Sequence, residues 1–204
     1  MAGYRAEIAQ IHPDWHNAPV VSFGDPAPRL LILGLAPGLR GAHRTGRAFT
    51  GDASGKLLFE TLIGTGLARG RYDADGRDDL RLPGVLISNA VRCLPPQNRP
   101  LGAELAACRP HLTALLTALP HLRAVLCLGR VAHDSVLRSA GHRLRDHPFG
   151  HAARHRVGPL EIHDSYHCSR YNTQTGRLTP AMLRAVVRAA GAAAGLLAQS
   201  GART

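Results

Sequence analysis

Short apolar runs alternate with longer stretches of helical hydrophobic spacing along this chain. Each run ends in a glycine or a small polar residue, which is typical of a buried strand. The predicted strands are RLLILG (29–34), GVLISN (84–89), AVLCLG (124–129) and PLEIHDS (159–165). The predicted helices cover residues 54–68, 102–119, 130–140 and 179–199. This alternation predicts an α/β fold, a three-layer α/β/α sandwich around a mostly parallel four-stranded sheet.

The chain is long enough to bury one core, because its 204 residues are 45% hydrophobic. We predict a single domain over residues 1–204. In this interpretation residues 1–24 are an N-terminal extension, residues 72–82 a polar surface loop, and residues 192–204 a frayed tail. Thr179 is the predicted N-cap of the last helix, with Pro180 as its first residue.

Basic residues outnumber acidic ones, with 25 Lys and Arg against 14 Asp and Glu and a formal net charge of +11. Such an excess is the electrostatic footprint of a protein that contacts nucleic-acid phosphates. The N-terminus lacks the apolar core of a signal peptide, and no run reaches the roughly 18 apolar residues of a membrane span. We expect a soluble, cytoplasmic protein, and a monomer, because no strong dimerisation face stands out.

Three polar segments directly follow predicted strands, at residues 34–55, 89–100 and 164–177. Ligands of open parallel sheets bind beyond the carboxyl ends of the strands, so these segments are predicted to line the site. The first segment contains neither the G-x-G-x-x-G of dinucleotide-binding folds nor the G-x-x-x-x-G-K-[ST] of P-loops. Its glycines therefore indicate another ligand that approaches the backbone closely.

Metal and disulfide chemistry find little support in the sequence. Histidines four residues apart would share a helix face and suggest a metal site, and such a series occurs at His147, His151 and His155. Pro148 and Gly150 argue against a helix there, so we predict no metal site. The four cysteines include no C-x2-C pair, and disulfides are not expected in the cytoplasm. They are Cys93, Cys108, Cys127 and Cys168.

Three long motifs carry a family resemblance. They are GLAPGLRGAHRTGRAFTGDASG, NAVRCLPPQNRP and SYHCSRYNTQTGRLT. Taken together they resemble the uracil-DNA glycosylase superfamily, with the best match to its family 5 (type B) enzymes, over roughly residues 20–190. The resemblance implies the fold of that superfamily. It also implies a monofunctional DNA glycosylase that flips uracil, or a related deaminated or modified base, out of DNA and leaves an abasic site.

The resemblance also implies roles for individual residues. Phe49 would stack on the flipped base, and Asn89 would read its Watson–Crick edge. Asp52 and His167 would be catalytic, as a general base or stabiliser of the sugar cation and as a hydrogen-bond donor to the base oxygen. The loop beside the base and the deoxyribose would consist of Gly34, Ala36, Pro37 and Gly38.

Simpler interpretations of the same residues stay open. Asp52 also fits the N-cap of the helix predicted to begin near residue 54, and Asn89 fits a turn after a strand. Phe49 alone fits an ordinary buried aromatic, and His167 a structural histidine. Ala36 stands where many superfamily members carry a polar side chain that activates water, which leaves Asp52 as the nearest carboxylate.

Two groups of residues are candidates for DNA contacts. Arginines of the first motif loop are expected at phosphates, although a solvated face would look the same; they are Arg40, Arg44 and Arg47. The third motif is expected to enter the minor groove and fill the gap left by the flipped base, with Arg170, Tyr171 and Asn172 as the wedge. The DNA contacts predicted there are Ser169, Arg170, Tyr171, Asn172 and Arg177.

The resemblance departs from the family pattern at the cysteines. Family 4 and 5 enzymes carry a 4Fe-4S cluster on four cysteines, two of them near the N-terminus. Cys93 and Cys108 match the second pair, and the first pair has no counterpart, so either the cluster has been lost or the start has been trimmed. We therefore expect no cluster and no other cofactor. Cys168 also replaces the usual proline after the histidine, which leaves open which base is excised.

Two alternative functions remain. A catalytically weak or inactive module on the same fold would bind DNA or a modified base without cutting it, which fits the absence of a cluster and of a first-motif acid or base. An enzyme that acts on free nucleosides or nucleotides is disfavoured by the basic charge and by the third motif.

Overall fold

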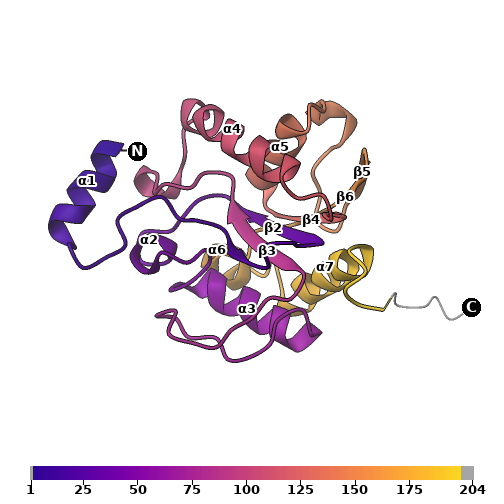
Figure 1. Ribbon diagram of the computed structural model, residues 1–204, viewed down its shortest axis with the longest axis horizontal. Helices are drawn as coiled ribbons and strands as arrows, with labels where there is room; N and C mark the ends of the chain where they lie inside the picture. The colour runs from indigo at the N-terminus through magenta and orange to yellow at the C-terminus, as the bar shows by residue number, and fades with distance from the viewer. Residues whose placement is uncertain (1, 199–204) are drawn as a thin grey trace, which may run out of the picture.

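The computed structural model describes residues 2–198 of the chain, which pack around one sheet of six strands (Figure 1). The four central strands are parallel, and an antiparallel strand lies at each edge. In sheet order the strands are β1 (Phe23–Gly24), β3 (Val85–Asn89), β2 (Leu30–Gly34), β4 (Ala124–Leu128), β6 (Leu160–Ser165) and β5 (Arg154–Val157). The α/β class and the mostly parallel sheet are as predicted.

The prediction of four strands is wrong, because it missed the two strands at the edges of the sheet. β1 has only two residues, and β5 reads Arg-His-Arg-Val, with no apolar run to reveal it. Each pairs through its backbone with a predicted strand, β1 with β3 and β5 with β6. Edge strands are commonly short and charged, which hides them from a search for hydrophobic runs.

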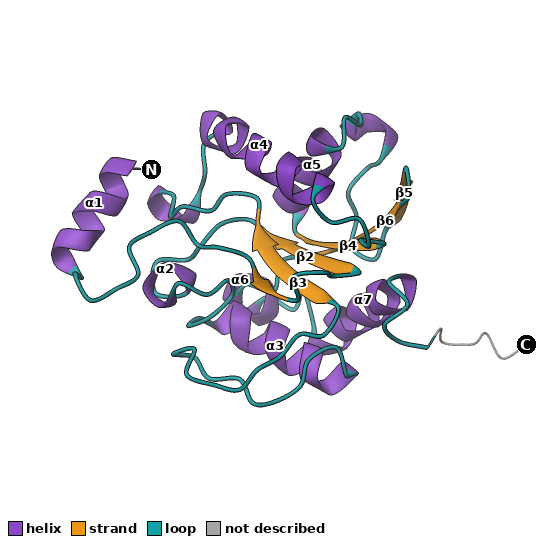
Figure 2. Cartoon of the chain, in the orientation of Figure 1, coloured by secondary structure: helices purple, strands orange, loops and turns teal. Residues whose placement is uncertain are grey.

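Helices cover both faces of the sheet (Figure 2). One face packs against α3 (Ala53–Thr65) and α7 (Pro180–Ala193), the other against α4 (Gly102–Thr117) and α5 (Arg130–Ser139). Alternate residues of β2 supply the two cores: Leu30 and Ile32 face the first pair of helices, and Leu31 and Leu33 face the second. All four are fully buried, which explains why β2 is a continuous apolar run in the sequence.

The four predicted helices are all present, with ends that differ by a few residues. α7 stops at Ala193, although its pattern predicted a helix to residue 199, and residues 199–204 of the predicted tail lie outside the described residues. The predicted N-terminal extension holds α1 (Ala2–Ile11) as well as β1. The remaining elements are short: α2 (Ala42–Thr45), α6 (Arg170–Gln174), η1 (Pro96–Asn98) and η2 (Leu144–Asp146).

The segment 72–82 is not the purely polar surface loop that its composition suggested. Leu80 and Leu82 are buried in the first core, and the fully buried side chain of Asp78 pairs with Arg47 of the motif loop at 2.6 Å. The segment therefore packs against the motif loop that precedes α3.

No helix among residues 2–198 has the length and apolar character needed to cross a bilayer. The carboxyl ends of β2, β3 and β6 lead into the three polar segments identified in the sequence.

Candidate base-binding and catalytic site

The first motif loop leaves β2 at a point where only glycine fits. A β-carbon on Gly34 would lie 2.5 Å from Cζ of Phe49 and 2.6 Å from Oδ1 of Asn89. Contacts this short force atoms apart, so the absence of a side chain at Gly34 lets the aromatic ring and the amide approach the backbone. The loop and the end of β3 thus meet at one place.

The loop between α2 and α3 is tightly turned around Phe49. Phe49 itself has φ of 55°, in the left-handed region that few side chains adopt. A β-carbon on Gly55 would come within 1.6 Å of the carbonyl oxygen of Phe49, so α3 approaches this turn only because residue 55 is glycine. Positive φ at a non-glycine residue of a ligand-facing loop is the kind of backbone strain that occurs at functional sites.

Asp52 caps α3, as the simpler interpretation predicted. Its Oδ1 accepts a hydrogen bond from the backbone N–H of Gly55 at 3.0 Å. Its Oδ2 lies beside the first motif loop, since a β-carbon on Gly41 would be 2.6 Å away and one on Gly38 3.1 Å away. The cap therefore fixes the carboxylate and leaves its second oxygen at the pocket.

His167 follows β6 and faces Phe49 across the pocket. The two ring centroids are 6.0 Å apart with an angle of 26° between the planes. Burial lowers the pKa of His167, and the charge of Asp52 only partly opposes this, so the ring is neutral at pH 7. Neither ring nitrogen has a partner within residues 2–198, which leaves an N–H free to donate to a ligand.

Asn89 is the last residue of β3 and is buried. Its register partner is Gly34 at the end of β2. In the described part of the chain its side-chain amide has no hydrogen-bond partner, so it is free to pair with the edge of a base.

These side chains enclose a small cavity of about 30 Å³, a volume suited to water. Entry of a base therefore requires the surrounding side chains to move apart. Ala42 and Ser54 line the cavity but were not predicted from the sequence, although both lie inside the first motif. Pro37 was predicted beside the base, but it is buried and does not line the cavity. The lining residues are Ala36, Gly38, Ala42, Phe49, Asp52, Ser54, Asn89 and His167.

The three arginines predicted at DNA phosphates have different surroundings. Arg40 is exposed, and Arg44 pairs at the surface with Asp75 at 2.8 Å. Arg47 binds both carboxylate oxygens of the buried Asp78, at 2.7 and 2.6 Å, and holds the pKa of that carboxyl at about 2. The guanidinium of Arg47 also stacks over Phe23 at 4.8 Å. These contacts commit Arg47 to the framework of the protein rather than to phosphate.

The third motif forms α6 immediately after His167. Ser169 caps this helix, and Nδ2 of Asn172 donates to the carbonyl oxygen of His167 at 2.8 Å. Arg170 and Tyr171 project into solvent, with Tyr171 71% exposed. Arg177 is exposed and lies 4.5 Å from the ring centre of Tyr166. Of the predicted wedge, Tyr171 and Arg170 are thus available to DNA, whereas Asn172 holds the His167 backbone.

Cys168 points into the core rather than toward the DNA-facing side of its loop. It is 1% exposed, and its thiol donates to the carbonyl oxygen of Ser54 at 3.5 Å. Burial and the nearby charge of Asp52 raise the pKa of this thiol to about 12, so it stays protonated. The side chain in the place of the usual proline is therefore a packing residue.

The four cysteines do not form an iron–sulfur site. Cys93 is half-buried and accepts a hydrogen bond from Arg5 at 3.3 Å, and Cys108 is half-buried on α4. Cys127 and Cys168 are packed in the two different cores, on opposite faces of the sheet. Across residues 2–198 no group of three metal-binding side chains includes a cysteine. These donors do not fit a 4Fe-4S cluster, which needs four converging ligands.

Of the histidines considered for a metal, His147 and His155 have ring centroids 5.6 Å apart, and His151 lies elsewhere. His151 stacks on Tyr166, away from the cluster of His133, His155 and Asp164. Nδ1 of His133 lies 2.8 Å from the Asp164 carboxylate, and its Nε2 lies 2.8 Å from the carbonyl oxygen of His147. Both partners are acceptors, so both nitrogens carry protons and neither has a lone pair for a metal.

Known proteins are similar to this sequence over nearly its whole length. The model of the uracil DNA glycosylase superfamily matches residues 21–191. A type-5 uracil-DNA glycosylase of Thermus thermophilus is 47% identical over 185 residues, which cover 90% of this chain and 84% of the relative. A type-5 uracil-DNA glycosylase of Mycobacterium bovis is 40% identical over 206 residues, which cover 96% of this chain and 76% of the relative.

More distant relatives agree with this result. A type-5 uracil-DNA glycosylase of Pyrobaculum aerophilum is 37% identical over 201 residues, which cover 97% of this chain and 88% of the relative. A type-4 uracil-DNA glycosylase of the same organism matches over a shorter stretch, with 34% identity across 56% of this chain and 50% of the relative. The chain therefore belongs to the uracil-DNA glycosylase superfamily and is similar to its type-5 members.

Proposed function

We propose that this protein is a monofunctional DNA glycosylase that hydrolyses the N-glycosidic bond of uracil in DNA and leaves an abasic site. The convergence of Phe49, Asn89, Asp52 and His167 on one cavity supports this proposal most directly. Such an enzyme needs an aromatic face, an amide that reads the base edge, and polar groups at the bond that breaks. The similarity to type-5 enzymes supports the same reaction.

The proposed chemistry follows from where charge develops. As the bond breaks, positive charge grows on the deoxyribose and negative charge on the departing base. The neutral ring of His167 donates a hydrogen bond to the base oxygen, which stabilises that negative charge. The free Oδ2 of Asp52 either stabilises the sugar cation or takes a proton from the attacking water.

Binding requires the base to leave the DNA stack, which costs a few kcal/mol. Stacking on Phe49 and hydrogen bonds to Asn89 offset this cost. Tyr171, exposed at the start of α6, is the candidate to fill the gap in the duplex. The proposed steps use this chain's own side chains, and its four cysteines do not come together as cluster ligands.

The test is single-turnover release of uracil from duplex and single-stranded oligonucleotides. Asp52→Ser retains a residue that caps helices well, while it removes the carboxylate, and Asp52→Ala removes both. We expect both variants, and His167→Ala, to lose most of the rate and keep DNA affinity. Asp146→Ala changes an exposed aspartate elsewhere and should match the wild-type rate. A wild-type rate in Asp52→Ser would reduce Asp52 to a helix cap and contradict the mechanism.

A second candidate is a module that binds a damaged or modified base without cutting it. The observation that favours it is Ala36 in the pocket lining, where the resemblance leads us to expect a polar side chain. Uracil-containing DNA would then bind with salt-sensitive affinity but release no base. The same assay, extended to hypoxanthine, xanthine and modified cytosines, separates the two functions and identifies the base.

A further inference from the structure

A larger cavity lies at the opposite end of the sheet from the proposed base pocket. Its volume is about 720 Å³, and it opens where the central strands begin. Arg29, Gly84 and Arg123 immediately precede β2, β3 and β4 and contribute to its lining. The base pocket lies at the carboxyl ends of the same sheet, and the two cavities share no lining residue.

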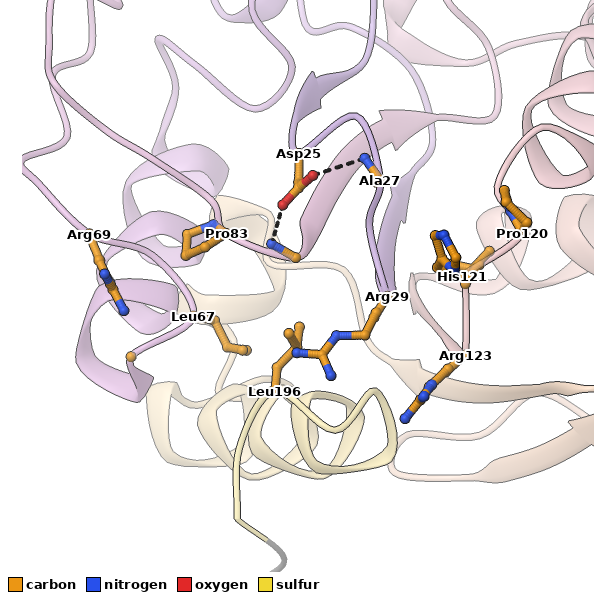
Figure 3. A pocket seen from close by; sticks show the side chains of 13 residues that line it. Asp25, Ala27, Arg29, Leu67, Arg69, Pro83, Pro120, His121, Arg123 and Leu196 are labelled. Carbon is orange, nitrogen blue, oxygen red and sulfur yellow. Dashed lines mark hydrogen bonds between the residues drawn. The ribbon is translucent and has the colours of Figure 1, made fainter.

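Two arginine side chains converge in this cavity. Figure 3 shows Arg29 and Arg123 directed toward Leu196, beyond the end of α7, and away from Asp25. A β-carbon on Gly195 would lie 3.3 Å from Nη1 of Arg123 and 3.5 Å from Nη1 of Arg29. Both guanidinium groups therefore border one small space beside Gly195.

No acidic side chain in the described residues neutralises this pair. Neither Arg29 nor Arg123 has a side-chain hydrogen bond or ion pair within residues 2–198. The carboxylate in the lining, Asp25, accepts the backbone N–H groups of Ala27 at 2.9 Å and Gly84 at 2.6 Å. Two like charges held close together repel each other, and a bound anion would remove that cost.

The backbone holds the two arginines in register. The N–H of Arg123 donates to the carbonyl oxygen of Arg29 at 2.9 Å, and the N–H of Arg29 donates to that of Gly84 at 2.9 Å. The carbonyl oxygen of Arg123 accepts from the N–H of Glu161 at 2.9 Å. Both side chains thus start from fixed strand ends, which lowers the entropy cost of binding a ligand between them.

We propose that this cavity binds a phosphate group between Arg29 and Arg123. The planar guanidinium fork matches the oxygens of a phosphate, and two such groups offer paired, charge-assisted hydrogen bonds. The cavity is larger than one phosphate, and Leu67 and Leu196 give it apolar surface for the rest of the molecule. Arg69 lies on the far wall, where it is placed for a second anionic group (Figure 3).

The experiment is a calorimetric titration of the full chain with pyrophosphate. Wild type should bind it saturably, and Arg29→Gln with Arg123→Gln should weaken binding by roughly tenfold or more. Arg184→Gln with Arg188→Gln removes the same charge from exposed positions on α7 and should change affinity by less than about twofold. If the double variant does not fold, the single variant Arg123→Gln replaces it in the titration, because Arg123 is exposed.

Two results would overturn the proposal: no saturable binding of pyrophosphate by wild type, or an equal loss of pyrophosphate affinity in the two double variants. Competition then identifies the source of the phosphate. A uracil-free oligonucleotide that displaces pyrophosphate assigns the site to the nucleic-acid backbone, and one that does not assigns it to a free metabolite. Uracil release should stay at the wild-type rate in both double variants, so this proposal fails or stands independently of the glycosylase activity.

Discussion

The buried pair of His133 and Asp164 makes the sharpest prediction about stability. Their side chains are 1% and 0% exposed and lie 2.8 Å apart. Since His133 also donates to the carbonyl oxygen of His147, it is held as an imidazolium. Burial alone would lower the pKa of His133, but the hydrogen bond and charge of Asp164, with the His147 carbonyl and Asp134, raise it above the ordinary value.

We expect Asp164→Asn to lower the free energy of unfolding by about 3–5 kcal/mol, because it leaves a buried imidazolium without its counter-charge. The sign of the pH dependence follows from the raised pKa. The stabilisation is complete below the unfolded value near 6.5 and is lost as the pH rises through the folded value. The difference in free energy of unfolding between wild type and variant should therefore be largest in mild acid and decrease toward high pH.

The assay is urea unfolding of both proteins at several pH values between about 5 and 9. Asp164 also lies 3.2 Å from Nε2 of His155, so the difference between the two curves reports both histidine contacts of this carboxylate, while histidines elsewhere titrate in both proteins. Asp134→Asn removes the charge of the next residue, which makes no hydrogen bond to the His133 ring, and it should cost less than about 1 kcal/mol. A loss below about 1 kcal/mol in Asp164→Asn, or a gap independent of pH, would refute a buried imidazolium.

Three further changes test the site and its framework. Phe49→Ala should slow single-turnover uracil release by about tenfold to a hundredfold through lost base stacking, with Phe23→Ala as the aromatic control outside the pocket. Gly34→Ala should abolish release while circular dichroism stays native, because the new methyl group would meet Phe49. Arg47→Lys should cost about 3 kcal/mol in chemical denaturation, since one ammonium cannot satisfy both oxygens of the buried Asp78, and DNA affinity of the folded protein should not change. Full activity of Gly34→Ala, or weakened DNA binding by Arg47→Lys, would contradict these assignments.

The parts of the fold that sequence predicts are those buried on both faces. β2, β3 and β4 lie in the middle of the sheet and are mostly apolar, so their signal is strong. β6 is also central but buries the polar residues His163, Asp164 and Ser165, and only Leu160 and Ile162 mark it in the sequence. β5 has exposed arginines and a single buried residue, Val157, and it exists because its backbone pairs with β6. Such a strand is specified by its neighbour, and local composition carries little trace of it.

Contacts between side chains far apart in the sequence also could not be predicted. Arg47 and Asp78 are 31 residues apart, as are His133 and Asp164, and neither spacing marks a contact. Arg47 looked like a phosphate ligand because its local sequence is basic, whereas the fold supplies a buried acid for it. The imidazolium of His133 depends further on a backbone carbonyl, which every residue has and no sequence pattern distinguishes.

The proposed site residues were easier to predict from the sequence, because small residues and candidate functional side chains occur together in one motif. Gly34 is required by the ring of Phe49, and Gly55 by the Phe49 carbonyl, so each glycine records where a larger group must approach the backbone. Asp52 combines both demands, because one oxygen caps α3 and the other reaches the pocket. Helix capping and catalysis are therefore not rival interpretations of Asp52. The cap holds the carboxylate in place, and a catalytic carboxylate must be held in place to act on one bond.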